Sequence, residues 1–391
     1  MVLQTNVKLN FGLHVLRKRP DGYHDLETLF VPCNEFGDTL EVITGDDYSR
    51  TSASLFARYS SLDYPEEQSG PGRVHSRALR SFDKLRTALR SGSAAAEYGL
   101  RPAAPPVWEG ELVQGISEDG RLMITIARKE GVDWDPLKDL CAKAYFLLAN
   151  DFQLPPVKIF LEKKAPVGAG LGGGSADAAF ALKAINELCS LGLSNESLAE
   201  YASRLGSDCA FFIWNRPMIG TGRGEILEPF DLDLSGYEVK VLVPEGVSVS
   251  TAEAYRGIVP QDRSFADAQD DMRDAQDDTV VIRAAKGKDA TTAATLGTLR
   301  GGTGAERSEA SGGVERSETV MASLPLGAHN LKTILRRPVE EWKDLLVNDF
   351  EATVFKAHPE LAAIKQSLYD SGAVYAAMSG SGSALFGLYK K

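Results

Sequence analysis

The sequence of 391 residues has few cysteines and no long apolar run. Its four cysteines, Cys33, Cys141, Cys189 and Cys209, are far apart and include no Cys-x-x-Cys pair. This spacing argues against a disulfide scaffold or a structural zinc site and favours a reducing cytosol. No apolar run approaches the roughly 20 residues needed to cross a bilayer, and the first residues lack a basic segment followed by an apolar one. We therefore expect a cytoplasmic protein.

The chain also has fewer basic residues than acidic ones. The chain has 43 Lys and Arg against 54 Asp and Glu, which gives a formal net charge of −11. Nucleic-acid and anionic membrane surfaces select for Lys and Arg, so neither is expected as the main partner. A small phosphorylated ligand held by backbone N–H groups remains compatible with this balance. The length predicts two or three domains, and the composition indicates no particular oligomeric state.

Two segments are poor in the aromatic and β-branched residues that build a core. The first, about 46–114, is rich in Arg and Ser, and the second, about 261–323, contains short direct repeats. Such segments cannot bury enough surface to offset a backbone-ordering cost of roughly 1–2 kcal/mol per residue. We expect both to be disordered insertions in surface loops, which are tolerated because loop-closure entropy grows slowly with length. The alternative is a dedicated binding arm.

Outside these segments, strands and helices mix without a strict βαβ repeat. Apolar and polar residues alternate from Val7 to Val15, which predicts a half-buried strand with Lys8 and Asn10 on its polar face. Periodicity and turn residues predict further strands at 157–161, 239–243, 374–378 and 384–389, and helices from about 175 and at 195–205, 338–348 and 359–371. This mixture indicates an α+β architecture in two lobes, 1–235 and 236–391.

The strongest local signal is a glycine loop between a predicted strand and a predicted helix. Its residues are Pro166, Val167, Gly168, Ala169, Gly170, Leu171, Gly172, Gly173, Gly174, Ser175 and Ala176. Glycines tolerate positive φ and let successive N–H groups approach an anion, and the following helix adds the positive end of its dipole. We therefore interpret the segment as a phosphate-binding loop. A flexible linker is the alternative, and the spacing fits neither a P-loop nor a dinucleotide-binding fingerprint.

Several polar residues elsewhere could carry chemistry. Asp208 precedes an apolar run, so its carboxyl group should be protonated or paired with a cation. It could serve as a general base towards a hydroxyl, with Lys8 as the candidate cation, or it could cap the following helix. Tyr23 and His24 follow a turn, where an aromatic ring and an imidazole could clamp a planar base. A glycine-serine loop at 379–383 joins two predicted strands.

Taken in this order, the motifs resemble the GHMP small-molecule kinases, which include galactose, homoserine and mevalonate kinases. The resemblance rests on five stretches, namely 8–10, 19–30, 166–179, 205–208 and 379–383. It implies a ribosomal-S5-like N-terminal lobe, a ferredoxin-like C-terminal lobe and an active site between them. It also implies phosphoryl transfer from ATP to a small-molecule hydroxyl, with Mg²⁺ on the phosphates.

The resemblance implies roles for individual residues. Asp208 would be the catalytic base and Lys8 its cationic partner, and the glycine loop at 166–176 would bind the ATP phosphates. The Asp-Gly-Tyr-His stretch is typical of a branch whose alcohol substrate carries a cytidine diphosphate group. The implied substrate-binding residues are Asn10, Tyr23, His24, Phe30 and Tyr255. No set of protein ligands for a metal is implied.

Two other functions stay open at this point. One is a related kinase that acts on homoserine, mevalonate or a sugar, and the other is a non-catalytic nucleotide-binding relative. The chain also departs from the family pattern at Ala176, where a second serine is more usual, so one hydroxyl contact to a phosphate could be absent. The second insertion follows Tyr255 closely and could loosen that aromatic ring.

Overall fold

The computed structural model describes residues 1–45, 110–258, 260 and 330–391. Most of the expected insertions, 46–114 and 261–323, therefore lies outside the described residues, and their disorder stays a prediction. One boundary is wrong, because strand β5 already begins at Glu111. The backbone of this strand pairs with β6 along its whole length, from Glu111 to Ile116. The described residues of 1–262 and 331–391 belong to one compact unit, and the division into two lobes stays a prediction.

A five-stranded sheet carries the segment that leads into the glycine loop. Its order is β1–β4–β7–β6–β5, with β6 and β7 parallel and the other pairs antiparallel. The strands are β1 Val2–Gln4, β4 Thr39–Thr44, β5 Glu111–Ile116, β6 Leu122–Arg128 and β7 Val157–Lys163. Because β7 is paired on both sides, the residue at which the glycine loop leaves the sheet is firmly placed.

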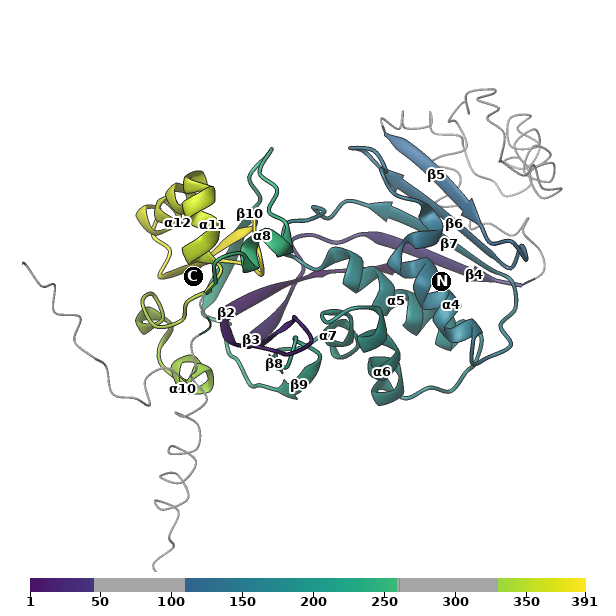
Figure 1. The fold of residues 1–391 in the computed structure, drawn as a ribbon, viewed down its shortest axis with the longest axis horizontal. Helices are drawn as coiled ribbons and strands as arrows, with labels where there is room; N and C mark the ends of the chain where they lie inside the picture. Colours follow the sequence, from purple (N-terminus) through teal and green to yellow (C-terminus); the bar gives the residue numbers. More distant parts are fainter. Residues whose placement is uncertain (46–109, 259, 261–329) are drawn as a thin grey trace, which may run out of the picture. The chain divides into compact units, whose positions relative to one another are not determined.

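Four helices form a layer beside this sheet, in which α4 and α5 pack against the strands and α6 and α7 pack against the other helices (Figure 1). They are α4 Leu140–Ala149, α5 Gly173–Leu188, α6 Asn195–Leu205 and α7 Cys209–Trp214. Their buried side chains form one apolar core with those of the sheet, including Leu161, Leu182 and Phe211. The predicted helix at 195–205 is confirmed, and the side chain of Ser194 caps it by accepting a hydrogen bond from the Ser197 N–H.

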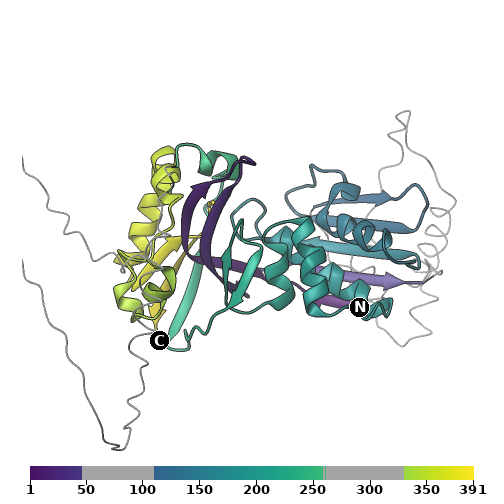
Figure 2. The ribbon, with the colours of Figure 1, turned by 60° about the horizontal axis from the view of Figure 1, so that its bottom comes forward.

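A second sheet is built on a long antiparallel hairpin of β2 Val7–Lys18 and β3 His24–Cys33, which run side by side in Figure 2. Strands β8 Met218–Thr221 and β9 Ile226–Pro229 extend it. A third sheet has the order β10–β12–β11, with β10 Tyr237–Leu242, β11 Tyr375–Met378 and β12 Leu385–Lys390. The remaining helices are α8 Thr251–Tyr255, α10 Leu331–Leu335, α11 Glu351–Ala357 and α12 Pro359–Asp370, with short 3₁₀ turns η1 Pro136–Lys138 and η3 Val339–Glu341.

Strand β2 is buried on both faces, so the half-buried strand expected from its alternation is wrong. Leu9 and Phe11 lie in an apolar core on one face, while Lys8 and Asn10 on the other face are only 3% and 2% exposed. Alternation distinguishes two faces of a strand but does not reveal what covers the polar one. Here two loops cover it, the glycine loop and the loop at 379–383.

The helix predicted at 338–348 is also absent from the described residues, which show only the 3₁₀ turn η3 there. Beyond that turn the backbone pairs with β2 instead, because the Leu13 N–H donates to the Val347 carbonyl and the Asp349 N–H donates to the Leu13 carbonyl. Trp342 and Leu346 have the spacing of a helical face, but their side chains pack against residues of β2. Within the described ranges, no helix is long and apolar enough to span a bilayer.

Candidate active site

A pocket of about 510 Å³ lies where β2, the glycine loop, the start of α7 and the loop at 379–383 come together. Its volume is that of ordinary small-molecule sites. Its lining residues are Lys8, Asn10, Leu13, Leu26, Thr28, Phe30, Gly168, Gly170, Gly172, Ser175, Gly206, Ser207, Asp208, Arg223, Ser248, Val249, Ser250, Thr251, Tyr255, Phe350, Gly380 and Ser381. The pocket thus gathers the expected base, cation and phosphate loop from segments far apart in the sequence.

Lys8 and Asp208 face each other on the wall of this pocket. Lys8 Nζ donates hydrogen bonds to Asn10 Oδ1 at 2.5 Å and to the Gly170 carbonyl at 2.8 Å, and it lies 3.5 Å from Asp208 Oδ2. Burial lowers the pKa of Lys8, and the Asp208 carboxylate opposes that shift. The three oxygens around the ammonium group thus offset part of the cost of its burial.

The structure separates the two local interpretations of Asp208. The residue occupies the N-cap position of α7, but among the described residues its side chain accepts no capping hydrogen bond. Its side chain is 29% exposed and opens into the pocket, so the carboxylate is less buried than the apolar run after it suggests. The Ser207 hydroxyl donates to Asp208 Oδ1 at 3.3 Å. A carboxylate held by a cation and a hydroxyl, and accessible to a ligand, is suited to general-base chemistry.

The glycine loop turns its residues alternately to the pocket and to the core. Gly168, Gly170 and Gly172 line the pocket with φ values of 75°, 75° and 73°, whereas Ala169 and Leu171 are buried in the core beneath. Such φ values are accessible to glycine without steric cost, so the pattern keeps the pocket face free of side chains. Backbone N–H groups can then approach phosphate oxygens closely.

The beginning of α5 differs from the expected one. The helix starts at Gly173, with Gly172 as its N-cap, so Ser175 lies in the first turn and does not cap the helix. Its hydroxyl-bearing side chain instead lines the pocket. Ala176 is fully buried in the apolar core, so a serine at this position would bring a hydroxyl into a packed environment.

The loop at 379–383 packs directly against the glycine loop. The Ser379 hydroxyl lies 3.3 Å from the Gly170 carbonyl, and the Ala384 N–H donates to the Ala169 carbonyl at 3.1 Å. A Cβ atom on Gly170 would lie 2.3 Å from the Ser379 carbonyl oxygen. The two loops are therefore in backbone contact, and only glycine fits at the point of closest approach.

Of the aromatic residues expected to bind a base, Phe30 and Tyr255 line the pocket, whereas Tyr23 and His24 lie outside its lining. The rings of His24 and Tyr255 stack on each other at 4.7 Å with an angle of 17° between their planes. Phe30 also lines the pocket but is only 2% exposed. Tyr23 is 58% exposed, outside the pocket lining, with the guanidinium of Arg223 5.3 Å from its ring centre. Because His24 and Tyr255 touch, a base would bind against this pair and not between its rings.

Arg223 is the main pocket residue that motif-based reasoning missed. It lies in the turn between β8 and β9, and its side chain is 39% exposed. A second missed residue is Thr28, which accepts a hydrogen bond from Asn10 Nδ2 at 3.1 Å and so fixes the orientation of that amide. The run Thr-Gly-Arg-Gly around Arg223 could have indicated a turn but not its position beside the pocket.

Within the described residues, the pocket contains no cluster of side chains that would bind a metal ion by itself. No group of three or more His, Cys, Asp or Glu residues in the described ranges could hold a metal ion. Mg²⁺ commonly binds through substrate phosphates with only one or two protein oxygens, so this finding is compatible with a phosphate-bound ion. Ser175 and Asp208 line the pocket and carry side-chain oxygens that could contribute such a contact.

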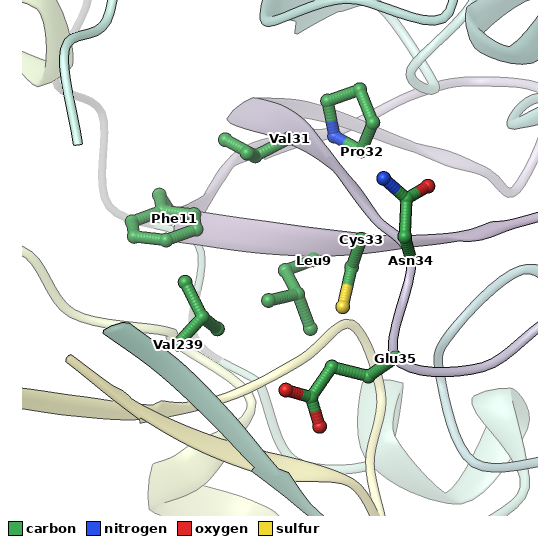
Figure 3. A pocket seen from close by; sticks show the side chains of 8 residues that line it. All are labelled: Leu9, Phe11, Val31, Pro32, Cys33, Asn34, Glu35 and Val239. Atoms are coloured by element: carbon green, nitrogen blue, oxygen red, sulfur yellow. The ribbon is translucent and has the colours of Figure 1, made fainter. Parts of the chain in front are cut away.

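A second cavity, of about 360 Å³, lies on the opposite face of β2 (Figure 3). It is lined by Leu9, Phe11, Val31, Pro32, Cys33, Asn34, Glu35 and Val239. This lining, all within the described residues, contains no Lys or Arg and none of the expected site residues. This cavity thus offers no cationic side chain to a phosphorylated ligand, whereas the first pocket contains Lys8 and Arg223.

Comparisons with known proteins identify the family of this chain. Residues 139–216 match the family of GHMP kinases N terminal domains, and residues 330–391 match that of GHMP kinases C terminal domains. A relative from Bacteroides fragilis is 34% identical over 389 residues, covering 100% of this chain and 92% of the relative. A relative from Bacteroides thetaiotaomicron is 32% identical over 390 residues, with coverage of 100% and 92%. The chain belongs to the GHMP kinase family, ATP-dependent phosphotransferases that act on small molecules.

Both relatives carry the name 4-diphosphocytidyl-2-C-methyl-D-erythritol kinase. The crystal structure of a 4-(cytidine 5'-diphospho)-2C-methyl-D-erythritol kinase has a TM-score of 0.54 and 24% identity, covering 99% of this chain and 90% of that chain. This likeness confirms the predicted fold class, an α+β GHMP kinase architecture. The roles of the individual site residues stay predictions.

Proposed function

We propose that this protein transfers the γ-phosphoryl group of ATP to the 2-hydroxyl of 4-diphosphocytidyl-2-C-methyl-D-erythritol, giving the 2-phosphate and ADP. The reaction belongs to the non-mevalonate (MEP) route to isoprenoid and terpenoid precursors. The observation that carries the proposal is the Lys8–Asp208 pair on the wall of a pocket that the glycine loop also lines. The shared name of the full-length relatives supports the identity of the acceptor.

Asp208 is the proposed base. Its carboxylate accepts the proton of the 2-hydroxyl as the oxygen of that hydroxyl bonds to the γ-phosphorus and the bond from that phosphorus to the ADP oxygen breaks. Lys8 holds the carboxylate in place and offers positive charge to the oxygen from which the proton leaves. Asn10, which orients Lys8 through its Oδ1 atom, lies beside the same reacting hydroxyl.

The glycine loop and the N-terminus of α5 bind the ATP phosphates in this proposal. Backbone N–H groups and the helix dipole stabilise negative charge without any rearrangement of side chains. The Ser175 hydroxyl would offer a loop-side oxygen to Mg²⁺ bound with the phosphates, and the ion would supply positive charge to them. The loop at 379–383 packs against the glycine loop through the Ser379 hydroxyl and the Gly170 carbonyl.

The cytidine diphosphate part of the substrate has complementary groups on the other side of the pocket. The stacked pair of His24 and Tyr255 offers an aromatic surface to cytosine. Arg223, on the pocket wall, offers a guanidinium to the diphosphate, a pairing that arginine makes with favourable geometry. Tyr23 lies next to Arg223 and extends this surface outward.

The test is ADP release by the purified protein with ATP and Mg²⁺, using the cytidyl substrate, mevalonate, homoserine and galactose in parallel. The proposal expects turnover with the cytidyl substrate alone. Turnover with another alcohol would assign a different member of the family, and ATP binding without turnover on any alcohol would indicate a non-catalytic relative. Omission of Mg²⁺ should abolish turnover. A cytoplasmic location stays a prediction from the sequence.

A further inference from the structure

A buried ionic network lies directly behind the glycine loop and takes no part in the proposed chemistry. Lys163 Nζ lies 2.5 Å from Asp38 Oδ2 and 2.6 Å from Asp177 Oδ2. The side chains of Lys163, Asp38 and Asp177 are 5%, 0% and 1% exposed. Buried ion pairs contribute little net stability, because desolvation offsets their mutual attraction. Stability alone is therefore a weak explanation for three ionisable groups at this place.

Every carboxylate oxygen of the network accepts a hydrogen bond. Asp38 Oδ1 accepts from the backbone N–H groups of Lys164 at 2.6 Å and Ala165 at 2.7 Å. Asp177 Oδ1 accepts from the Thr5 hydroxyl at 3.0 Å, and Thr5 Oγ1 in turn accepts from the Asp38 N–H at 3.0 Å. Such complete pairing gives the network one defined geometry.

The network joins the two ends of the glycine loop. Lys163 is the last residue of β7, and the two N–H groups bound by Asp38 belong to the residues that lead into Pro166. Asp177 lies early in α5, the helix that begins where the loop ends. A Cβ atom on Gly173, the first residue of that helix, would lie 3.8 Å from Asp38 Oδ2 and 3.9 Å from Lys163 Nζ. One cluster thus fixes the entry and the exit of the loop.

We propose that Lys163, Asp38 and Asp177, which we name the loop brace, are positioning residues that hold the glycine loop in its phosphate-binding conformation and so set the affinity for ATP. This inference rests on the function proposed above. The loop is rich in glycine, which has the largest conformational entropy to lose when a ligand orders it. Fixing both ends beforehand reduces that loss at the moment of binding.

The ammonium group of Lys163 lies between the two carboxylates and contacts both of them. Burial raises the pKa of Asp177, and the attraction of Lys163 opposes that shift. The charges of the loop brace therefore compensate one another within the cluster.

The experiment measures the affinity of brace variants for the non-hydrolysable analogue AMP-PNP with Mg²⁺, by calorimetry, and separately for the cytidyl substrate. Asp38→Ala removes the acceptor of both loop N–H groups, whereas Asp38→Asn keeps a carbonyl oxygen for them. We expect Asp38→Ala to weaken AMP-PNP binding by about tenfold or more, the size of effect seen when residues that orient the ligands of a metal site are removed. Asp38→Asn should weaken binding less. The affinity for the cytidyl substrate should stay within about twofold.

Two further variants keep the test decisive. Leu148→Ala, in the core of α4, is a matched control that should lower the melting temperature and leave both affinities unchanged. Thr5→Val removes the bridging hydroxyl at nearly constant volume and decides the question if Asp38→Ala does not fold. A folded Asp38→Ala or Thr5→Val protein with wild-type affinity for AMP-PNP, or with equal losses for both ligands, would overturn the loop brace. Wild-type protein that does not bind AMP-PNP would instead overturn the proposed function itself, and the loop brace with it.

Discussion

Replacement of Asp208 by asparagine should remove most turnover and leave the fold and ATP binding in place. The carboxylate makes no capping hydrogen bond in the described part of the chain, so α7 does not depend on it. Lys8 keeps its bonds to Asn10 and to the Gly170 carbonyl in the variant. We expect a stability loss of about 1–3 kcal/mol, because the buried ammonium loses one charged partner.

The loss of turnover has a separate cause and should be large. General acid–base catalysis contributes about 100- to 10,000-fold in rate, or about 2.7–5.4 kcal/mol of transition-state stabilisation. Asparagine has nearly the same shape as aspartate but cannot take up the hydroxyl proton. The decrease should appear in kcat for the cytidyl substrate, while the affinity for AMP-PNP changes by less than about threefold.

The assay is continuous ADP release at saturating ATP and cytidyl substrate, with calorimetric titration of AMP-PNP on the same preparations. Asp151→Asn, the same chemical change at an exposed residue outside the pocket, is the matched control and should keep wild-type turnover. A kcat within tenfold of the wild type would refute the assignment of Asp208 as the base. So would a loss of AMP-PNP affinity that matches the loss of turnover.

Three other changes have distinct expected outcomes. Gly170→Ala should destabilise the protein by about 1–3 kcal/mol and weaken AMP-PNP binding, because its Cβ would meet the carbonyl oxygen of Ser379. The control Gly236→Ala, whose Cβ would have no neighbour within 4 Å, should leave thermal unfolding unchanged. Equal effects of the two changes would contradict the close approach of the two loops. His24→Ala should raise KM for the cytidyl substrate and leave KM for ATP unchanged, and a loss confined to kcat would contradict base recognition. The pKa of Lys8 is lowered in the folded protein, so the unfolded state binds more protons between that pKa and 10.5. In this window, the unfolding free energy of the wild type relative to Lys8→Gln should rise with pH, while kcat of the wild type falls. A difference in unfolding free energy between the two proteins that stays constant with pH, measured by urea unfolding, would count against this prediction.

Local signals accounted for the elements whose causes lie within a few residues. The helix at 195–205 was predictable because a serine cap, an amphipathic pattern and a terminal glycine all lie in its own segment. The strands near the C-terminus and the glycine loop were predictable for the same reason. The helix expected at 338–348 failed because Trp342 and Leu346 owe their burial to β2, a strand more than 300 residues earlier in the chain, and not to a helical face.

The sequence by itself determined the family, the glycine loop and the residue types of the proposed site, since these depend on motifs written in consecutive residues. The motifs also suggested that Lys8 pairs with Asp208, as the structure shows. Only the tertiary structure decided that Arg223 joins the pocket and that His24 and Tyr255 touch each other. Alternation along β2 marked a polar face, but the loops that bury this face come from distant parts of the chain. A pattern in sequence records the contrast between two faces of an element, whereas its partners are selected by packing of the whole chain.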